Sequence, residues 1–372
     1  MFMKLKDQAQ KFLSKAGITI NGSNPWDMQV HDERLYGRVL RGGSLALGEA
    51  YMDGWWDAPA LDQFFDKLLS TDVDKQAQPW YLKVAEQAVH RIFNYQSKKR
   101  AFEVGEKHYD IGNDLYERML DARMVYTCAY YKDAKTLDEA QEAKLDLVCR
   151  KLGLQKGQRI LDIGCGWGSF AKFAAQKYGA SVVGLTVSVE QADYARKNCE
   201  GLPVDIRVQD YREIHEQFDH IVSIEMFEAV GYKNFREYME VVRRCLKPEG
   251  LFVLQTIGGN FSVVSTDPWI EKYIFPNGML PSIKQIGKAV ENLLVVEDLH
   301  NFGFDYDRTL MEWNERFQKA WPDLKEKYGE RFKRMWEYYL LQCAGSFRAR
   351  RNQDWQIVFS PNGVPGGYTA VR

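Results

Sequence analysis

Apolar residues in the second half of the chain gather in short runs that alternate with amphipathic stretches. Runs such as RILDI (159–163), SVVGLT (181–186) and LFVLQTI (251–257) suit buried strands. Stretches with helical spacing lie between them, as at 137–152 and 234–246. This alternation is typical of a parallel sheet, so we predict an α/β fold, a Rossmann-like methyltransferase sheet with helices on both faces. The remaining expected elements are strands at 204–208, 220–224, 293–299 and 355–360, helices at 169–178 and 188–199, and two helices between 308 and 350.

The N-terminal part of the chain has a different pattern, in which short amphipathic stretches are broken by glycine. Helices are expected at 3–15, 33–41 and 60–69, with a break at Gly42 and Gly43. We predict four parts: a small, mostly helical, lipid-engaging domain at 1–75 around Trp55 and Trp56, a helical linker at 76–100, a catalytic domain at 101–372, and within it an insertion at 258–292 that caps the sheet.

Composition narrows the class of protein. Lysine and arginine total 50 against 51 acidic residues among 372, which implies no general attraction to nucleic acid. No apolar run is long enough for a membrane span or a signal peptide, so we expect a cytoplasmic protein. The 6 cysteines form no CxxC pair, which argues against a zinc site and a disulfide framework.

The segment LDIGCGWGSF places Gly164, Gly166 and Gly168 between an expected strand and an expected helix. Glycines at such a turn let the backbone approach a ligand, and they leave N–H groups at the helix start free for an anionic group. Dinucleotide-binding folds share this kind of turn. Asp162 before the turn and Cys165 within it favour a methyl donor over a nicotinamide cofactor.

Polar residues also follow the next two expected strands. One strand ends at Thr186 and is followed by Ser188 and Gln191, the polar groups available there. Asp210 comes directly after the strand VDIRV and suits an acceptor for an adenine amine, with Tyr211 beside it. A helix-capping role for Asp210 stays open. Because ligands of such sheets lie across the carboxyl ends of adjacent strands, we expect S-adenosylmethionine at this edge.

Six segments carry a resemblance to a known family: LDIGCGWG, VVGLTVSVEQ, FEAVG, YIFPNGMLPS, HNFGFDYDRTL and ERFKRMWEYYLLQCAGSFRAR. With GSLALGEAYMDGWW near the N-terminus, the chain resembles the cyclopropane-fatty-acyl-phospholipid synthases over nearly its whole length. The resemblance implies transfer of a methylene group from S-adenosylmethionine to the cis double bond of an unsaturated phospholipid in a membrane bilayer. It also implies a homodimer, peripheral association with the inner face of the membrane, and a bound bicarbonate ion as general base.

The same resemblance assigns roles to residues. It implies donor contacts from Tyr126, Thr127, the loop from Gly164 to Gly168, the stretch from Thr186 to Gln191, and Asp210 with Tyr211. It implies that Cys128, Glu228 and Tyr306 bind the ion. Cys343 matches a cysteine that is marked as active in this family, although a cysteine among Leu, Ala and Phe also suits an inert, packed role.

Two positions depart from the family pattern. The family often has a histidine where this chain has Gln255, and another where it has Ala229. A glutamine can still donate one hydrogen bond to an oxyanion, but it carries no positive charge. We therefore count Gln255 among the catalytic candidates and expect weaker anion binding, with a cyclopropane as the main product. A displaced base would instead give a methyl-branched alkene.

Ring closure requires removal of a proton from the newly added methyl group. Glu228 could remove it directly, or it could hold another base, and a purely structural role is also open. The resemblance favours the holding role. Two other functions stay open: a methyltransferase for a soluble metabolite, which would not need the aromatic N-terminal segment, and a non-catalytic lipid-binding protein, which would not need the donor loop.

Overall fold

The computed structural model describes residues 2–71 and 112–372 and divides into two compact units. The described residues of the first unit are 2–71, Ser265–Pro276 and Tyr306–Asn352, and those of the second are 112–264, Asn277–Asp305 and Gln353–Arg372. The expected linker at 76–100 lies outside the described residues, and the domain division expected from the sequence stays a prediction. Two segments that the sequence analysis assigned to the catalytic domain, Ser265–Pro276 and Tyr306–Asn352, belong to the same compact unit as the N-terminal segment.

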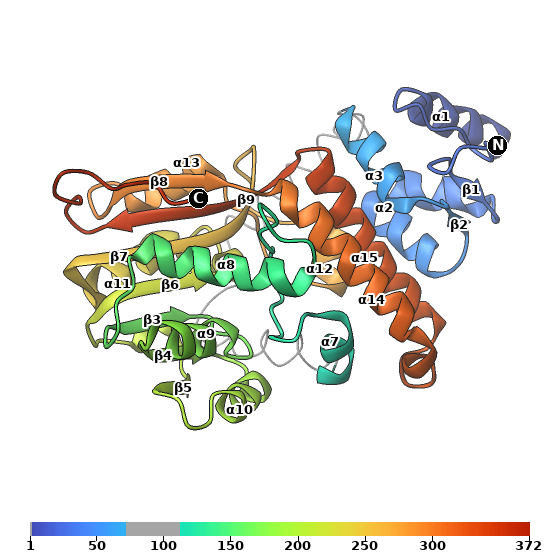
Figure 1. The fold of residues 1–372 in the computed structure, drawn as a ribbon. Coiled ribbons are helices and arrows are strands. Elements are labelled where there is room, and N and C mark those ends of the chain that lie inside the picture. The colour runs from blue at the N-terminus through green and yellow to red at the C-terminus, as the bar shows by residue number, and fades with distance from the viewer. Residues whose placement is uncertain (1, 72–111) are drawn as a thin grey trace. The chain divides into compact units, whose positions relative to one another are not determined.

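A seven-stranded sheet forms the centre of the second unit (Figure 1). Its strands are β3 (Arg159–Ile163), β4 (Ser181–Thr186), β5 (Val204–Val208), β6 (Phe218–Ile224), β7 (Leu246–Gly259), β8 (Val295–Asn301) and β9 (Asn352–Ser360). The order across the sheet is β5-β4-β3-β6-β7-β9-β8, with parallel pairing from β5 to β7 and antiparallel pairing of β8 with β9. The predicted Rossmann-like fold is confirmed, and its topological switch point lies between β3 and β6.

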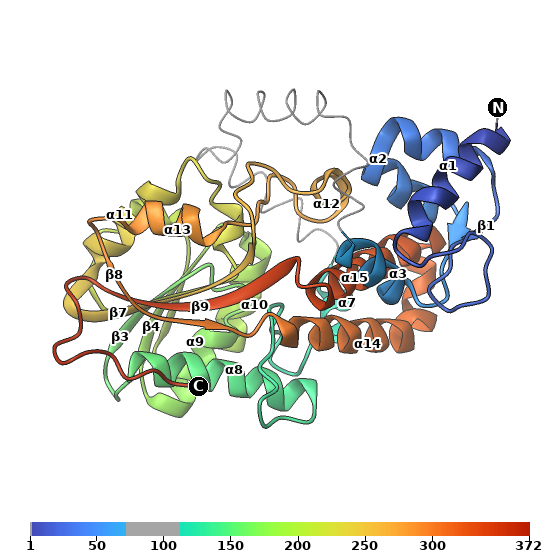
Figure 2. The same ribbon diagram turned by 90° about the horizontal axis from the view of Figure 1, so that it is seen from above.

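Helices cover both faces of this sheet (Figure 2). On one face α8 (Leu137–Leu152) and α9 (Ser169–Tyr178) bury their apolar sides, and on the other face α11 (Phe235–Cys245) and α13 (Ile283–Val290) do so. A third helix, α10 (Val189–Asn198), packs beside β4 and β5. Because both faces are covered, the strands between them carry almost continuous apolar runs, as the sequence pattern indicated.

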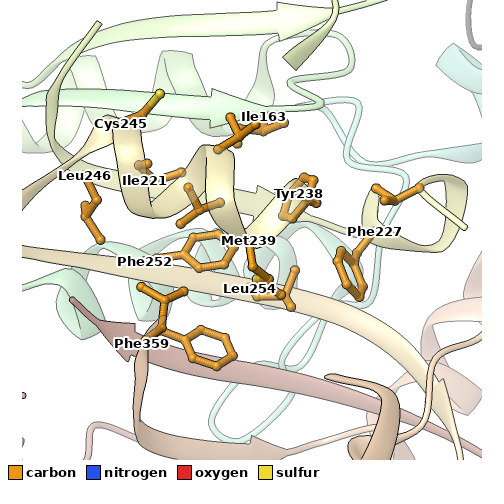
Figure 3. Packing of buried hydrophobic residues seen from close by; sticks show 14 of the residues in the cluster. Ile163, Ile221, Phe227, Tyr238, Met239, Cys245, Leu246, Phe252, Leu254 and Phe359 are labelled. Atoms are coloured by element: carbon orange, nitrogen blue, oxygen red, sulfur yellow. The ribbon is translucent and has the colours of Figure 1, made fainter. Parts of the chain in front are cut away.

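The core beneath α11 is built from interlocking rings (Figure 3). Phe252 of β7 stacks on Phe359 of β9 with ring centres 5.6 Å apart, and the rings of Tyr238 and Phe227 meet edge-on with centres 5.2 Å apart. All four side chains are fully buried. Burial on this scale contributes about 1.5–3 kcal/mol per large side chain, so this cluster fixes the strand ends that carry the site.

Local chemistry sets the ends of the helices that flank the sheet. Thr136 and Glu139 form a capping box at the start of α8, and Gly153 ends the helix in a left-handed conformation at φ 60°. Ser282 and Gln285 form a second capping box at the start of α13. The helix expected over 137–152 therefore has the predicted bounds.

The first unit is mostly helical. Its elements are α1 (Phe2–Ser14), β1 (Gln29–Val30), α2 (Arg34–Met52), β2 (Trp56–Asp57), α3 (Leu61–Ser70), α12 (Pro268–Tyr273), α14 (Phe304–Tyr328) and α15 (Glu330–Arg348). Of α14, the residues from Tyr306 onward belong to this unit. The break expected in α2 is present, because Gly43 has φ 56° and ψ −138°, but the helix resumes after it over a stretch where the sequence pattern predicts no helix. No described helix has an apolar stretch long enough to cross a membrane.

Two glycines let the helices of the first unit approach closely. A Cβ atom at Gly345 of α15 would lie 2.6 Å from the Asp62 carbonyl oxygen, and one at Gly48 of α2 would lie 2.4 Å from the Trp269 ring. Trp56 is fully buried, with its Nε1 donating to the Leu47 carbonyl oxygen at 3.0 Å. Trp56 is therefore part of this core, and the lipid-engaging role expected of the segment around it stays a prediction.

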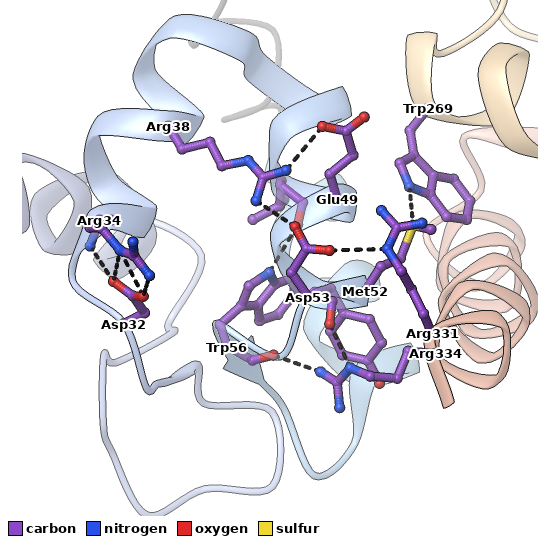
Figure 4. A network of polar contacts seen from close by, with 12 residues as sticks. Asp32, Arg34, Arg38, Glu49, Met52, Asp53, Trp56, Trp269, Arg331 and Arg334 are labelled. Atoms are coloured by element: carbon purple, nitrogen blue, oxygen red, sulfur yellow. Dashed lines mark hydrogen bonds and ion pairs between the residues drawn. The ribbon is translucent and has the colours of Figure 1, made fainter. Parts of the chain in front are cut away.

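Charged side chains join the segments of the first unit (Figure 4). Asp53 accepts from Arg38 at 2.8 Å and from Arg331 of α15 at 3.1 Å. Arg334 of the same helix donates to Asp57 at 2.6 Å and to the Trp56 carbonyl oxygen at 3.0 Å. The contacts of Arg331 and Arg334 join residues 277 or 278 positions apart, so the N-terminal helices depend on the C-terminal ones for their packing.

Candidate active site

The glycine-rich turn lies at the carboxyl end of β3, beside the switch point. Gly164, Gly166 and Gly168 all have positive φ angles, of 86°, 52° and 82°. The amides of Gly164 and Cys165 both donate to the Leu185 carbonyl oxygen at 2.9 Å, which ties the turn to β4. α9 begins directly after Gly168. The turn has the local geometry that the sequence predicted.

The space around these glycines differs in a way that suits a bound donor. A Cβ atom at Gly164 would lie 2.5 Å from Met226, whereas one at Gly166 would meet no described atom within 4 Å. Asp162 is buried, and its Oδ2 has no partner among the described residues. Burial raises the pKa of the Asp162 carboxyl to about 7. An open backbone cradle beside an unsatisfied acceptor fits a ligand with ammonium or hydroxyl groups.

The polar groups that follow β4 bind one another. The Thr186 hydroxyl donates to Gln191 Oε1 at 3.0 Å. The backbone amide of Gln191 donates to Ser188 Oγ at 3.2 Å, so Ser188 caps the start of α10. All three side chains are buried. They fix the turn at the end of β4, and their contacts with a donor stay a prediction.

Asp210 follows β5 and caps the short 3-10 helix Tyr211–Glu213. Its Oδ1 accepts from the Arg212 amide at 2.9 Å and from Arg212 Nε at 2.8 Å. The edge of the Tyr211 ring packs against Tyr238, with ring centres 5.0 Å apart. The capping role that the sequence left open is present, and the adenine contact stays a prediction.

The segment before α8 carries the other residues expected to contact the donor. The Thr127 carbonyl oxygen accepts from Gln141 Nε2 at 2.8 Å, and its hydroxyl accepts from the buried Lys144. Tyr126 packs edge-on against Tyr116, with ring centres 5.1 Å apart. Burial lowers the pKa of the Lys144 ammonium. Lys144 thus joins α8 to the loop that leads into Cys128.

A cluster of buried carboxyl groups lies at the carboxyl ends of β6 and β7. Glu228 Oε1 accepts from the Thr256 hydroxyl at 3.0 Å and from the Ile257 amide, while its Oε2 is buried without a partner among the described residues. Burial, and then the negative charge of Glu225, raise the pKa of the Glu228 carboxyl to about 8. Glu228 therefore holds a proton near neutral pH and is rigidly oriented, as the holding role requires.

Gln255 stands at the centre of this cluster and is fully buried. Its Nε2 donates to Glu225 Oε1 at 2.9 Å and to Asp354 Oδ2 at 3.0 Å, and its Oε1 accepts from Gln356 Nε2 at 3.0 Å. A glutamine amide has two hydrogens, and both are used inside the protein. This geometry differs from the expectation that Gln255 donates to an oxyanion: the side chain instead connects β6, β7 and β9.

Cys128 is fully buried beside these groups, and its amide donates to Glu225 Oε1 at 2.7 Å. Its thiol donates to the Ala129 carbonyl oxygen at 3.3 Å. Burial, and then the charges of Asp354 and Glu225, raise the pKa of the Cys128 thiol well above its ordinary value. The thiol therefore stays neutral, which suits binding rather than nucleophilic attack.

Tyr306 and Cys343 belong to the first unit. The Tyr306 ring stacks on Phe347 with centres 4.5 Å apart. Cys343 lies on α15, and burial raises the pKa of its thiol to about 12. A neutral thiol is a poor nucleophile, so the structure favours the packed role that the sequence left open.

Glu225 and Asp354 are the two members of the cluster that sequence reasoning missed. Glu225 directly follows β6 and has φ 50°, which is uncommon for a side-chain-bearing residue and typical of a functional site. Asp354 lies in β9, whose other buried residues are mostly apolar. The signal for Asp354 was present in NQDWQIVFS, because a charge in a buried strand needs a reason. Nothing in the local sequence marks Glu225.

Comparison with known proteins identifies the family of this chain. The family model of mycolic acid cyclopropane synthetase matches residues 96–357. A cyclopropane-fatty-acyl-phospholipid synthase from Escherichia coli (strain K12) is 55% identical over 98% of this chain and 95% of the relative. A tuberculostearic acid methyltransferase from Mycobacterium tuberculosis is 32% identical over 90% of this chain and 82% of the relative.

Solved structures give the same result for the fold. The cyclopropane synthase MmaA2 from Mycobacterium tuberculosis has a TM-score of 0.65 and 30% identity, covering 69% of this chain and 97% of that chain. The mycolic acid cyclopropane synthase CmaA1 in complex with SAH and CTAB has a TM-score of 0.65 and 31% identity, with the same coverage of 69% and 97%.

Proposed function

Because the chain belongs to the mycolic acid cyclopropane synthetase family, we propose that it forms cyclopropane rings on membrane phospholipids with S-adenosylmethionine as donor. The acceptor is the cis double bond of an unsaturated acyl chain. The observation that carries this proposal is the 55% identity to a cyclopropane-fatty-acyl-phospholipid synthase over 98% of this chain, together with an intact donor turn. A soluble-metabolite methyltransferase or a non-catalytic lipid-binding protein would not account for both.

The donor turn and the carboxyl cluster have separate tasks in this reaction. S-Adenosylmethionine supplies an electrophilic methyl group when bound. The open backbone at Gly166 and the unsatisfied Asp162 oxygen would hold the donor, and helix α9 begins beside it. The buried setting of Cys128 keeps water from the cationic acyl chain that methyl transfer produces. Positioning of this kind contributes several kcal/mol, about 7 or more in favourable cases.

A small oxyanion, bicarbonate, serves as the base that removes the proton in ring closure. Two observations support an anion here: Glu228 Oε2 and Asp354 Oδ1 are buried without a partner among the described residues, and burial raises the pKa of both carboxyl groups, so each can carry a proton to donate. A buried polar atom without a partner costs about 1–3 kcal/mol, so a ligand that satisfies both would bind favourably. Glu228 holds the ion in place for the proton transfer.

Mass spectrometry of lipids tests the function directly. Purified protein, S-adenosylmethionine and vesicles of unsaturated phosphatidylethanolamine should yield acyl chains heavier by one CH₂ group, and NMR should show cyclopropane protons at high field. If a methyl-branched alkene is the main product, the protein catalyses the related methyl transfer and not ring formation. Absence of any donor-dependent product, with donor binding intact, would overturn the proposal.

Peripheral association with the membrane belongs to the same proposal, and the first unit offers a contact surface for it. Leu40 is 68% exposed at the break of α2, and Arg41 beside it is also exposed. The guanidinium carbons of Arg34 and Arg38 each lie 4.7 Å from the Trp55 ring centre, and both arginines also form ion pairs with acidic residues of the same unit. An apolar side chain beside arginines suits the surface of an anionic bilayer.

Sedimentation with anionic vesicles tests this contact surface. Leu40→Asp and Arg41→Glu should each weaken binding by about fivefold, in line with roughly 1 kcal/mol per basic residue at a charged surface. Lys319→Glu on α14 is the matched control, since it makes the same charge change at a side chain that is 72% exposed. If Arg41→Glu and the control weaken vesicle binding equally, net charge explains the loss, and the proposed contact surface is wrong.

A homodimer is the last part of the proposal. Strand β8 forms an edge of the sheet, and Val295, Val296 and Leu299 on it are 42%, 51% and 40% exposed. Exposed apolar edge strands are disfavoured in isolated monomers, which supports a second copy there. Light scattering should give twice the chain mass, and Val296→Lys should shift the protein toward a monomer. A monomeric mass for the unaltered protein would contradict the dimer.

A further inference from the structure

Asp354 is the least satisfied member of the carboxyl cluster. Its side chain is fully buried at the start of β9. Oδ2 accepts one hydrogen bond, from Gln255 Nε2 at 3.0 Å, and Oδ1 is buried without a partner in the described part of the chain. The Cys128 thiol, a weak donor, also lies within hydrogen-bonding reach of this carboxyl. A carboxylate accepts up to about four hydrogen bonds, so one N–H donor and one weak thiol donor are too few to stabilise its charge in the interior.

The neighbouring groups decide which carboxyl of the cluster is ionised. Glu225 accepts from two N–H groups, of Cys128 and of Gln255, on a single oxygen, whereas Asp354 accepts from one. The other groups that face Asp354 are the acidic Glu228, the neutral thiol of Cys128 and the ammonium of Lys144. Burial, and then the charges of Glu225 and Glu228, raise the pKa of the Asp354 carboxyl well above its ordinary value. Of the Glu225 and Asp354 carboxyl groups, that of Asp354 is therefore the one that keeps its proton.

A protonated carboxyl group has one O–H to donate. Its Oδ2 is occupied as an acceptor of the Gln255 amide, so the proton belongs on Oδ1, the atom that has no partner among the described residues. An unmatched donor of this kind needs an external acceptor. The neighbouring Gln255 cannot supply the same hydrogen bond, because both of its amide hydrogens are already used.

We propose that Asp354 is a further anion-binding residue, which keeps its proton and donates it as a neutral hydrogen bond to the small oxyanion beside Cys128 and Glu228. This rests on the oxyanion of the proposed function. Asp354 thereby supplies the donor that a glutamine at position 255 leaves missing. The pair formed by Gln255 and Asp354 acts as one unit, in which the amide holds the carboxylic acid in place.

Two substitutions separate a neutral donor from a carboxylate. Asp354→Asn keeps a neutral donor of nearly the same shape, whereas Asp354→Leu removes it. In degassed buffer with added sodium bicarbonate, the Asn variant should need bicarbonate within about threefold of the unaltered protein, and the Leu variant should need about tenfold more. Gln353→Leu is the matched control on the same strand: its side chain is buried and pairs with Asn301 at 2.9 Å. Its bicarbonate requirement should not change.

Infrared spectroscopy gives a readout that does not depend on turnover. The unaltered protein at neutral pH should show the carbonyl stretch of a buried protonated carboxylic acid that is absent from the Asp354→Asn variant. Addition of bicarbonate should shift this band, because its O–H acquires an acceptor. Donor binding, measured by calorimetry with S-adenosylhomocysteine, should stay the same in every variant and shows that each is folded.

The outcomes distinguish this inference from the proposed function. If Asp354→Asn loses as much as Asp354→Leu, or if the Asp354 band is absent, then Asp354 acts as a carboxylate and the inference is wrong. If the unaltered protein forms no ring although the band is present and shifts with bicarbonate, the proposed function fails while the role of Asp354 stands.

Discussion

The donor turn and the carboxyl cluster occupy the same edge of one sheet, but they are built in opposite ways. The turn comes from a single segment of five residues, Gly164 to Gly168, and works through its backbone. The cluster takes side chains from four distant segments, at Cys128, Glu225, Gln255 and Asp354. The turn depends on room near the backbone, and the cluster depends on how protons and charges are shared in a dry interior.

The largest effect is expected in the turn. Gly166→Val should abolish donor binding, with a loss of more than about hundredfold, because the side chain would fill the open cradle beside the backbone. Calorimetry with S-adenosylhomocysteine measures it. Gly153→Val is the matched control: this glycine also has positive φ, and a Cβ atom there would meet no described atom within 4 Å, but it caps α8. Equal loss of binding in both variants would mean that backbone strain, and not space, explains the result.

A smaller effect is expected in the cluster, where one position affects both activity and stability. Glu228→Leu should lower the rate of ring formation by more than about tenfold, because the ion loses its holder, whereas Glu228→Gln keeps a neutral hydrogen-bond donor and should retain most of the rate. The folded protein binds a proton at Glu228 up to about pH 8, while the unfolded chain releases it near 4.5. Stability therefore falls as pH rises between these values, and the glutamine should remove that loss, about 1–3 kcal/mol at pH 8.

Urea unfolding of the unaltered protein and of Glu228→Gln at pH 5.5 and pH 8 measures this loss of stability. The exposed Glu326→Gln on α14 is the control, and its stability should follow that of the unaltered protein. A full rate for Glu228→Leu would overturn the assigned role. An unchanged pH slope would show instead that Glu228 is ionised in the folded state.

The smallest effect concerns Asp162, which lies in β3 two residues before the turn. Its pKa of about 7 means that the carboxyl is half protonated at neutral pH. A donor ammonium group favours the ionised form, so affinity should rise about fivefold from pH 6 to pH 8, and Asp162→Asn should flatten this dependence. Calorimetry in buffers of different ionisation enthalpy also measures the proton released. A slope that persists in the asparagine variant would place the titrating group elsewhere.

The contrast between a local turn and a cluster of distant side chains also explains which features could be predicted from the sequence. The order of strands and helices from 137 to 360 was predictable, because apolar runs and capping residues are local signals, as at Thr136 and Gly153. The turn was predictable for the same reason. The use of both Gln255 hydrogens was not, since it depends on which side chains three separate strands bring together. The sequence also could not show that Trp56 is buried while Trp55 beside it is partly exposed, because exposure is a property of packing and not of residue type.

Strand β9 lies between β7 and β8, although it is the last strand to be translated. A nascent chain that has left the ribosome as far as β8 already contains the donor turn and every strand that flanks it. It lacks Asp354, and β8 has no neighbour to pair with. Since domains generally fold from the N-terminus during synthesis, the growing polypeptide should gain donor binding before it gains anion binding. A premature stop codon before residue 352 would therefore yield a product that sequesters the donor without consuming it.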